Sequence, residues 1–196
     1  ECSFQFDPIG KNTFDTSSCD IAKTFLAKAG VSYTNVEAAA GTIATVSVGK
    51  TVFTAPNPAN LHGDAKKTAT KAFQDELKGG LVAVGYPDKA DNARIDKVAV
   101  VAILWALAML VTMVYGPIAA LLVELFPTRI RYTSMSLPYH IGNGWFGGFL
   151  PTTAFAMVAA TGNIYYGLWY PVVVAAATVV IGLIFLPETF RRNIDD

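Results

Sequence analysis

The sequence predicts an α-helical polytopic membrane protein that carries a small extracytoplasmic α+β domain. The first observation is a change of composition. Residues 1–97 hold most of the charges, whereas residues 98–187 contain as formal charges only Glu124, Arg129 and Arg131. The second observation is the length of two uncharged segments. Residues 98–123 form a run of about 26 residues, where a membrane-spanning helix needs roughly 20, and residues 132–187 form one of about 56.

The second uncharged segment is too long for a single helix across a hydrocarbon core of about 30 Å. It must turn once, and we place the turn at "TGNIYYG", residues 161–167, because Gly-Asn favours turns and tyrosines favour the membrane interface. A transmembrane region over 97–196 then contains spans at about 98–123, 134–160 and 167–187. The alternative, apolar helices in the core of a soluble protein, needs more polar surface than this chain has.

Positively charged residues in short loops predict the orientation of the spans. Arg129 and Arg131 flank the first turn, and Arg191 and Arg192 follow the third span, so both places should be cytoplasmic. The turn at 161–167 and the domain formed by residues 1–96 then lie outside the cytoplasm. Basic residues just before the first span oppose this orientation, but aspartates accompany them.

Residues 1–96 show the local signals of a small α+β domain. A Ser/Asp cap and Gly30 delimit a helix at about 18–29, and a second helix at about 64–77 ends at "KGG". Between them, "TIATVSVGKTVFTA" alternates apolar and polar residues around a Gly-Lys turn, which predicts a β-hairpin. "LVAVGY", which follows the second helix, predicts a further short strand.

Cys2 and Cys19 are the two cysteines of the chain, and both lie in the part placed outside the cytoplasm. An even number in an oxidising compartment predicts a disulfide that closes a loop of about 17 residues and contributes roughly 3 kcal/mol. Two unrelated thiols are the alternative. The spacing fits no metal-binding pattern, and His62 is better explained as an exposed loop residue than as a ligand, so we expect no metal site.

The sequence contains no catalytic triad, phosphate-binding loop or paired carboxylates in residues 1–96. We therefore expect no enzyme activity, no catalytic residues and no cofactor. Because the formal net charge is zero, no overall field favours nucleic acid as a partner. The chain starts at Glu1 rather than at Met and has no signal-peptide pattern, so we expect it to belong to a longer protein.

Polar side chains within the predicted spans are candidates for a functional site, because they are costly at bilayer depth. Tyr139, His140 and Asn143 are spaced so that they can share one helical face. Histidine as a residue type suits proton coupling near neutral pH, which makes His140 a candidate, although a neutral histidine bonded to a neighbouring helix explains it equally well. Tyr115 precedes Gly-Pro, and such interruptions often line a cavity. Trp105 can reach the same cavity, with ordinary packing as the alternative.

Two motifs resemble the end of a major facilitator superfamily transporter, its helices ten, eleven and twelve. They are "YGPIAALLVELFPTRIRYTSMS" at 115–136 and "LPETF" at 186–190, and the resemblance covers about 97–190. The branch that looks most similar is the bacterial metabolite:proton symporters. The resemblance implies a multi-pass protein of the bacterial inner membrane that transports small solutes such as organic acids or zwitterions together with protons.

The resemblance also implies roles for the charges at the inner ends of the spans. Glu124, Arg131 and Glu188 correspond to an ion-pair cluster that opens and closes during alternating access, with Arg129 as an accessory member. A topology signal at the membrane edge accounts for the arginines but not for Glu124. Residues 1–96 then form an insert between helices nine and ten.

Three spans cannot form both bundles of such a transporter, so the remaining helices and the lipid bilayer are expected partners. A membrane-anchored extracytoplasmic binding or sensory domain is the alternative function. A membrane-bound enzyme is disfavoured, because the sequence has no catalytic constellation.

Overall fold

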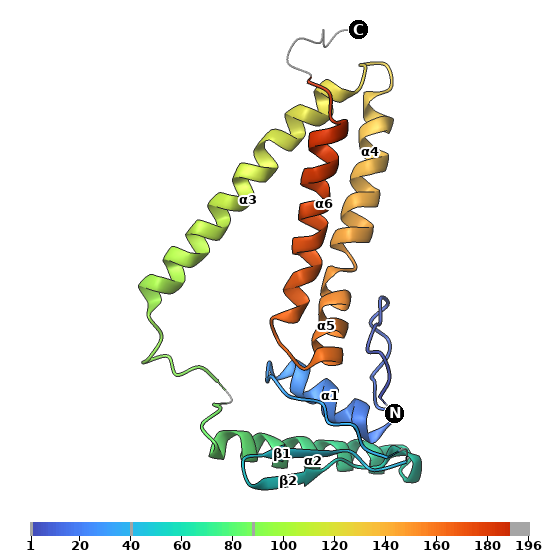
Figure 1. Cartoon of the computed structure of the whole chain (residues 1–196), viewed down its shortest axis with the longest axis vertical. Coiled ribbons are helices and arrows are strands. Elements are labelled where there is room, and N and C mark those ends of the chain that lie inside the picture. Colours follow the sequence, from blue (N-terminus) through green and yellow to red (C-terminus); the bar gives the residue numbers. More distant parts are fainter. Residues whose placement is uncertain (1, 40, 88, 189–196) are drawn as a thin grey trace. The chain divides into compact units, whose positions relative to one another are not determined.

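The computed structural model of the chain describes residues 2–39, 41–87 and 89–188 (Figure 1). Two compact units make up these residues. The first unit contains the described residues up to 87 together with 149–173, and the second contains 89–148 together with 174–188. Part of the predicted transmembrane region therefore packs with the N-terminal residues.

Helix α1 (Ser18–Lys28) opens the first unit and follows its local signals. The Ser17 hydroxyl accepts a hydrogen bond from the Asp20 amide at 3.0 Å, which is the usual N-cap arrangement. The helix is followed by Gly30 at φ 67°, a left-handed conformation that favours glycine. Its buried face includes Ile21 and Leu26. The prediction of a helix at 18–29 is confirmed.

Strands β1 (Thr45–Val48) and β2 (Thr51–Thr54) form the predicted β-hairpin. They pair antiparallel, with Val46 opposite Phe53, and Gly49 occupies the turn at φ 60°. A short 3₁₀ turn, η1 (Pro58–Asn60), leads from the hairpin towards helix α2.

Helix α2 (Asp64–Ala83) is longer than the sequence signals indicate. It continues through Gly79 and Gly80 and includes the first three residues of "LVAVGY", so the predicted helix end at "KGG" and the predicted strand are wrong. The physical reason is a continuous apolar face. Phe73, Leu77 and Leu81 follow at intervals of one turn and are 4%, 0% and 8% exposed. Burial of this face outweighs the cost of about 1 kcal/mol for each helical glycine.

The core of the first unit lies between α1, the hairpin and α2. It consists of the buried apolar side chains Ile21, Ala22, Leu26, Ala55, Phe73, Leu77 and Leu81. The ring of Phe53 lies directly over Gly80, where any side chain on the helix would collide with it. Gly80, which the sequence pattern predicts to end the helix, is therefore the position where Phe53 packs on α2.

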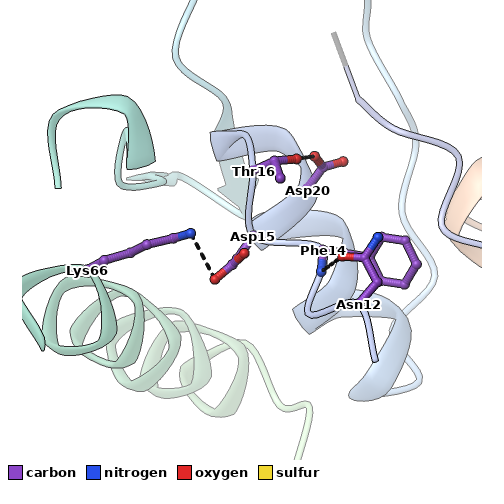
Figure 2. A network of polar contacts seen from close by, with 6 residues as sticks. All are labelled: Asn12, Phe14, Asp15, Thr16, Asp20 and Lys66. Carbon is purple, nitrogen blue, oxygen red and sulfur yellow. Dashed lines mark hydrogen bonds and ion pairs between the residues drawn. The ribbon is translucent and has the colours of Figure 1, made fainter. Parts of the chain in front are cut away.

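The N-terminal segment is fastened to α1 by covalent and polar contacts. Cys2 and Cys19 form a disulfide with their Cα atoms 5.3 Å apart. Asp20, which is 1% exposed, accepts hydrogen bonds from the backbone and hydroxyl of Ser3 at 2.8 and 2.7 Å. Its other oxygen accepts from Thr16, as Figure 2 shows.

An ion pair holds α2 beside the start of α1. Figure 2 shows Lys66, on α2, reaching Asp15, and the Nζ and Oδ2 atoms are 2.9 Å apart. The hydrogen bond from Lys66 lowers the pKa of the Asp15 carboxyl below its ordinary value of 3.8.

The remaining elements form the predicted membrane region. Two helical stretches among the described residues are long and apolar enough to cross a membrane: helix α3 (Lys97–Leu125), and residues 166–185, which contain η3 (Tyr166–Leu168) and helix α6 (Trp169–Phe185). These match the predicted spans at 98–123 and 167–187 by length and composition.

The segment predicted as the middle span, 134–160, is an interrupted helix. It consists of helix α4 (Arg131–Ile141), a π-helical turn η2 (Gly142–Gly147) and helix α5 (Leu150–Thr161). Helix α4 belongs to the second unit and α5 to the first. The count of three spans stays a prediction.

Candidate functional site

Helices α3 and α4 of the second unit line an open cavity of about 390 Å³. Each helix contributes residues at positions i, i+3, i+4 and i+7, the spacing of one helical face. Most of the lining is apolar, and tyrosine and serine supply the polar groups. The lining residues are Tyr115, Ile118, Ala119 and Leu122 of α3 and Tyr132, Met135, Ser136 and Tyr139 of α4.

Two of the predicted path residues meet in this cavity. Tyr115 and Tyr139, from different helices, both line it. Tyr115 lies two residues before Pro117, which is inside α3 and lacks the amide hydrogen that a regular helix would use at that position. Trp105 lines a separate apolar hollow at the N-terminal end of α3, beside Val98 and Val101.

His140 is held by its own helix. Its Nδ1 lies 2.7 Å from the backbone oxygen of Ser136 and 3.3 Å from the Ser136 hydroxyl. Because a carbonyl oxygen only accepts, Nδ1 carries the hydrogen, and in the neutral ring Nε2 is the nitrogen that can take up a proton. The ring also contacts Tyr139 edge to face, with centroids 6.1 Å apart. His140 is thus adjacent in sequence and space to a residue of the cavity.

Asn143 lies in the π-helical turn and is exposed in this chain. Its carbonyl accepts a hydrogen bond from the Gly148 amide at 2.8 Å, five residues later. Gly148 has no room for a side chain, because a Cβ atom would collide with the Gly144 carbonyl. Gly148 is therefore explained by the geometry of the turn. Asn143 is not among the residues that line the cavity with Tyr139. Turns of this kind frequently occur at functional sites.

The short connection 126–130 joins α3 to α4 and contains Arg129, one of the predicted gate residues. Helix α3 ends at Leu125, just before Phe126 and Pro127, as expected for a residue that precedes proline. Arg131, the first residue of α4, donates from Nε to the Phe126 carbonyl at 3.0 Å. Its side chain therefore satisfies a carbonyl at the end of α3 and ties the two helices together.

The other predicted gate residues are near the same end of the second unit. Glu124 lies in the last turn of α3, and Arg129 is exposed in the connection. Glu188 follows α6, whose C-terminal end is at the end of the second unit where α3 and α4 join (Figure 1). The ion-pair cluster itself stays a prediction.

A third structural feature, absent from the sequence-based predictions, is the capping of α5 by the N-terminal residues of the first unit. The Tyr33 hydroxyl donates to the Ala159 carbonyl at 2.7 Å, and the Asn35 side chain donates to the Ala160 carbonyl at 3.2 Å. The Tyr33 amide donates to the Gly162 carbonyl at 2.8 Å. The last carbonyl groups of a helix have no hydrogen-bond partner within the helix. The bonds from Tyr33 and Asn35 therefore satisfy carbonyl oxygens at the end of α5 that would otherwise lack a partner in the helix.

The surroundings of this cap are tightly packed. Ala156 and Ala159 are 0% and 1% exposed, and burial raises the pKa of Tyr33 to about 12. Gly162 has φ 75°, and the Tyr33 backbone occupies the place of a side chain there. The partners are about 126 residues apart in sequence, so no local pattern indicates this contact.

In the described part of the chain, no group of three or more His, Cys, Asp or Glu side chains is placed to hold a metal ion.

Comparison with known proteins identifies the chain's relatives. It is 40% identical over 83 residues to a Haemophilus influenzae protein named "Putative metabolite transport protein". The aligned region covers 41% of this chain and 17% of that protein. A glycine betaine/proline/ectoine/pipecolic acid transporter of Dickeya dadantii is 34% identical over 86 residues, or 44% of this chain and 17% of the transporter.

A further Haemophilus influenzae protein of the same name is 31% identical over 117 residues, which is 59% of this chain. The aligned regions span only 17% to 25% of the length of these three relatives. No solved structure matches the chain. Residues 79–196 match the family described as "Sugar (and other) transporter", and this match covers more than half of the chain. The chain therefore belongs to this family of the major facilitator superfamily.

Proposed function

We propose that this chain provides helices ten to twelve of a proton-coupled symporter, which moves small metabolites such as organic acids or zwitterions by alternating access. The observation that carries the proposal is the family match over 79–196, which includes the cavity between α3 and α4. The name of one relative specifies glycine betaine, proline, ectoine and pipecolic acid, which supports zwitterions as one class of solute. The metabolite:proton branch is proposed on the same grounds.

Tyr115 and Tyr139 are the residues of this chain that we place along the solute path. Their side chains line one cavity from two helices, and their hydroxyl groups are among its few polar groups. Asn143, in the π-helical turn, and Trp105, near the N-terminal end of α3, would line the path at other depths.

His140 is the proposed proton site. The hydrogen bond from Nδ1 to the Ser136 carbonyl fixes the tautomer and keeps Nε2 available as the proton acceptor. Its contact with Tyr139 would link protonation to a residue of the solute cavity.

We place the C-terminus in the cytoplasm and residues 1–96 outside it, in a bacterial inner membrane. The disulfide between Cys2 and Cys19 supports an oxidising location for the N-terminal residues. Glu124, Arg131 and Glu188, with Arg129 as an accessory, would then form the cytoplasmic gate. The bond from Arg131 to the Phe126 carbonyl supports a role at the junction of α3 and α4.

The direct test is uptake by the full-length parent protein in proteoliposomes, with and without an imposed proton gradient, against a panel of carboxylates and zwitterions. We expect gradient-driven uptake whose rate depends on pH. His140→Ala should abolish that dependence, whereas His62→Ala, which changes the other histidine of the chain, should leave it intact. An uptake rate that is the same with and without the proton gradient would refute proton coupling. Unchanged pH dependence of uptake in His140→Ala would refute the assignment of His140 as the proton site.

A further inference from the structure

The first unit contains a cavity of about 830 Å³ that is separate from the cavity between α3 and α4. One wall is α1, another is the extended segment 31–38, and a third is formed by residues 42–49 of the hairpin region. Cavities that bind small molecules usually have volumes of roughly 300 to 1,000 Å³. The size is therefore suitable for a metabolite.

Lys23 of α1 lines this cavity and is partly buried. Within the part of the chain that the structure describes, its ammonium group has no hydrogen-bond or ion-pair partner. The nearby carboxylate of Asp20 is already occupied, since Ser3 and Thr16 donate to its two oxygens. Burial lowers the pKa of Lys23 from its ordinary value, although Asp20 opposes that shift. An ammonium group that is partly buried and makes no hydrogen bond is stabilised by a further negative charge, so an anion in the cavity would be favoured.

The rest of the lining restricts the kind of anion. Ala22, Leu26, Val31 and Leu81 give the cavity an apolar side that suits a hydrocarbon group. Glu37 also lines the cavity and repels an anion more strongly the more charges that anion carries, which favours a single charge. A single ammonium beside apolar side chains matches a molecule with one carboxylate and an apolar body.

We propose that this cavity binds a small amphipathic monocarboxylate, with its carboxylate paired to the Lys23 ammonium and its apolar body against Ala22, Leu26 and Leu81. This site lies outside the proposed transport path. One of its walls is already fixed, because Tyr33, which lines the cavity, is bonded to the end of α5. A wall held in place before binding reduces the ordering cost of binding.

The test is calorimetric titration of the full chain in nanodiscs of zwitterionic lipid, with empty nanodiscs as the blank. Benzoate and hexanoate are the probes, and benzamide and hexanamide are their uncharged counterparts. We expect each carboxylate to bind at least about tenfold more tightly than its amide, because only the carboxylate forms a charge-assisted bond. Equal affinity for a carboxylate and its amide, or no binding of either carboxylate, would overturn the proposal. This part of the test uses the unmodified chain and needs no variant.

Lys23→Met keeps the unbranched stem but removes the charge, and should weaken carboxylate binding by roughly tenfold to a hundredfold. Lys23→Arg should stay within a few fold of the original chain. Lys28→Met is the matched control, because Lys28 is an exposed residue of the same helix and does not line this cavity. Unchanged affinity in a folded Lys23→Met chain would refute the assignment of Lys23. The measurement involves equilibrium binding alone, so failure here would leave the proposed transport function untouched.

Discussion

Asp20 shows how one buried carboxylate organises the beginning of this chain. Burial opposes its ionisation, but hydrogen bonds from Ser3, Ser17 and Thr16 outweigh that effect and lower its pKa from 3.8. Gln5 donates to the backbone oxygen of the same residue at 3.1 Å. Hydrogen bonds to Asp20 therefore hold the segment before α1, and the Cys2–Cys19 disulfide joins the same segment to this helix.

The pKa shift of Asp20 predicts that the first unit is less stable in acid. Because the folded-state pKa lies below the unfolded value, the stabilisation is present above about pH 4 and is lost as the pH falls through the folded-state value. Asp20→Asn should lower stability at pH 7 by about 1–3 kcal/mol and make it less dependent on pH. Thermal unfolding of the full chain at pH 7 and pH 3, followed by circular dichroism, measures both effects. The exposed Asp75→Asn is the control; if both variants respond alike, the role of Asp20 is refuted.

At the scale of elements, the structure distinguishes two adjacent glycines in α2. A side chain at Gly80 would collide with the ring of Phe53, whereas a Cβ atom at Gly79 meets no atom within 4 Å. We expect Gly79→Ala to stabilise α2 by about 0.5–1 kcal/mol through helix propensity, and Gly80→Ala to destabilise it by about 1–3 kcal/mol through overpacking. Native-state hydrogen exchange of the α2 amides measures both changes. Equal effects at the two positions would contradict the packing of Phe53 on α2.

The cap at the end of α5 predicts a second contrast between glycines. Gly162→Ala places a side chain against the Tyr33 backbone at a positive φ, and should weaken the cap by more than about 1 kcal/mol. Gly182→Ala, in the open part of α6, is the matched control. Hydrogen exchange should become faster around residues 31–35 in the first variant only. Unchanged exchange in residues 31–35 would show that the position of Tyr33 is not stabilised by its hydrogen bonds to the end of α5.

These elements also show which features local patterns reveal. The caps of α1 and the alternation in the hairpin are local signals, and both elements lie where the pattern predicts them. The C-terminal part of α2 departs from the local pattern because its glycines lie on a helix that is stabilised by Phe73 and Leu77 packing into the core. The π-helical turn contains the hydrogen bond from the Gly148 amide to the Asn143 carbonyl and leaves no room for a Cβ atom at Gly148, and neither feature has a signature in hydrophobic periodicity.

At the scale of the whole molecule, composition and packing divide the chain differently. The charge pattern places a boundary near residue 97, but residues 149–173 pack with the N-terminal residues in one unit. The reason is the set of hydrogen bonds from Tyr33 and Asn35 to the end of α5, together with the contact of Phe6 with Phe149. Tyr115 and Tyr139, two residues that the sequence proposes for the solute path, line the cavity between α3 and α4, and their role in transport stays a prediction. The other lining residues cannot be predicted from the sequence alone, because they depend on which faces of α3 and α4 lie against each other.

The charges at the α3–α4 connection provide the test that separates a transporter from an anchored binding domain. If Glu124 and Arg131 form part of a gate, Glu124→Gln and Arg131→Gln should each reduce uptake by the full-length parent about tenfold. The double variant should lose less than the product of the two effects, because residues that act together are not additive. Arg129→Gln, at an exposed position of the same connection, should have a smaller effect. Uptake that tolerates all three substitutions would favour the anchor function, in which these charges mark only the edge of the membrane.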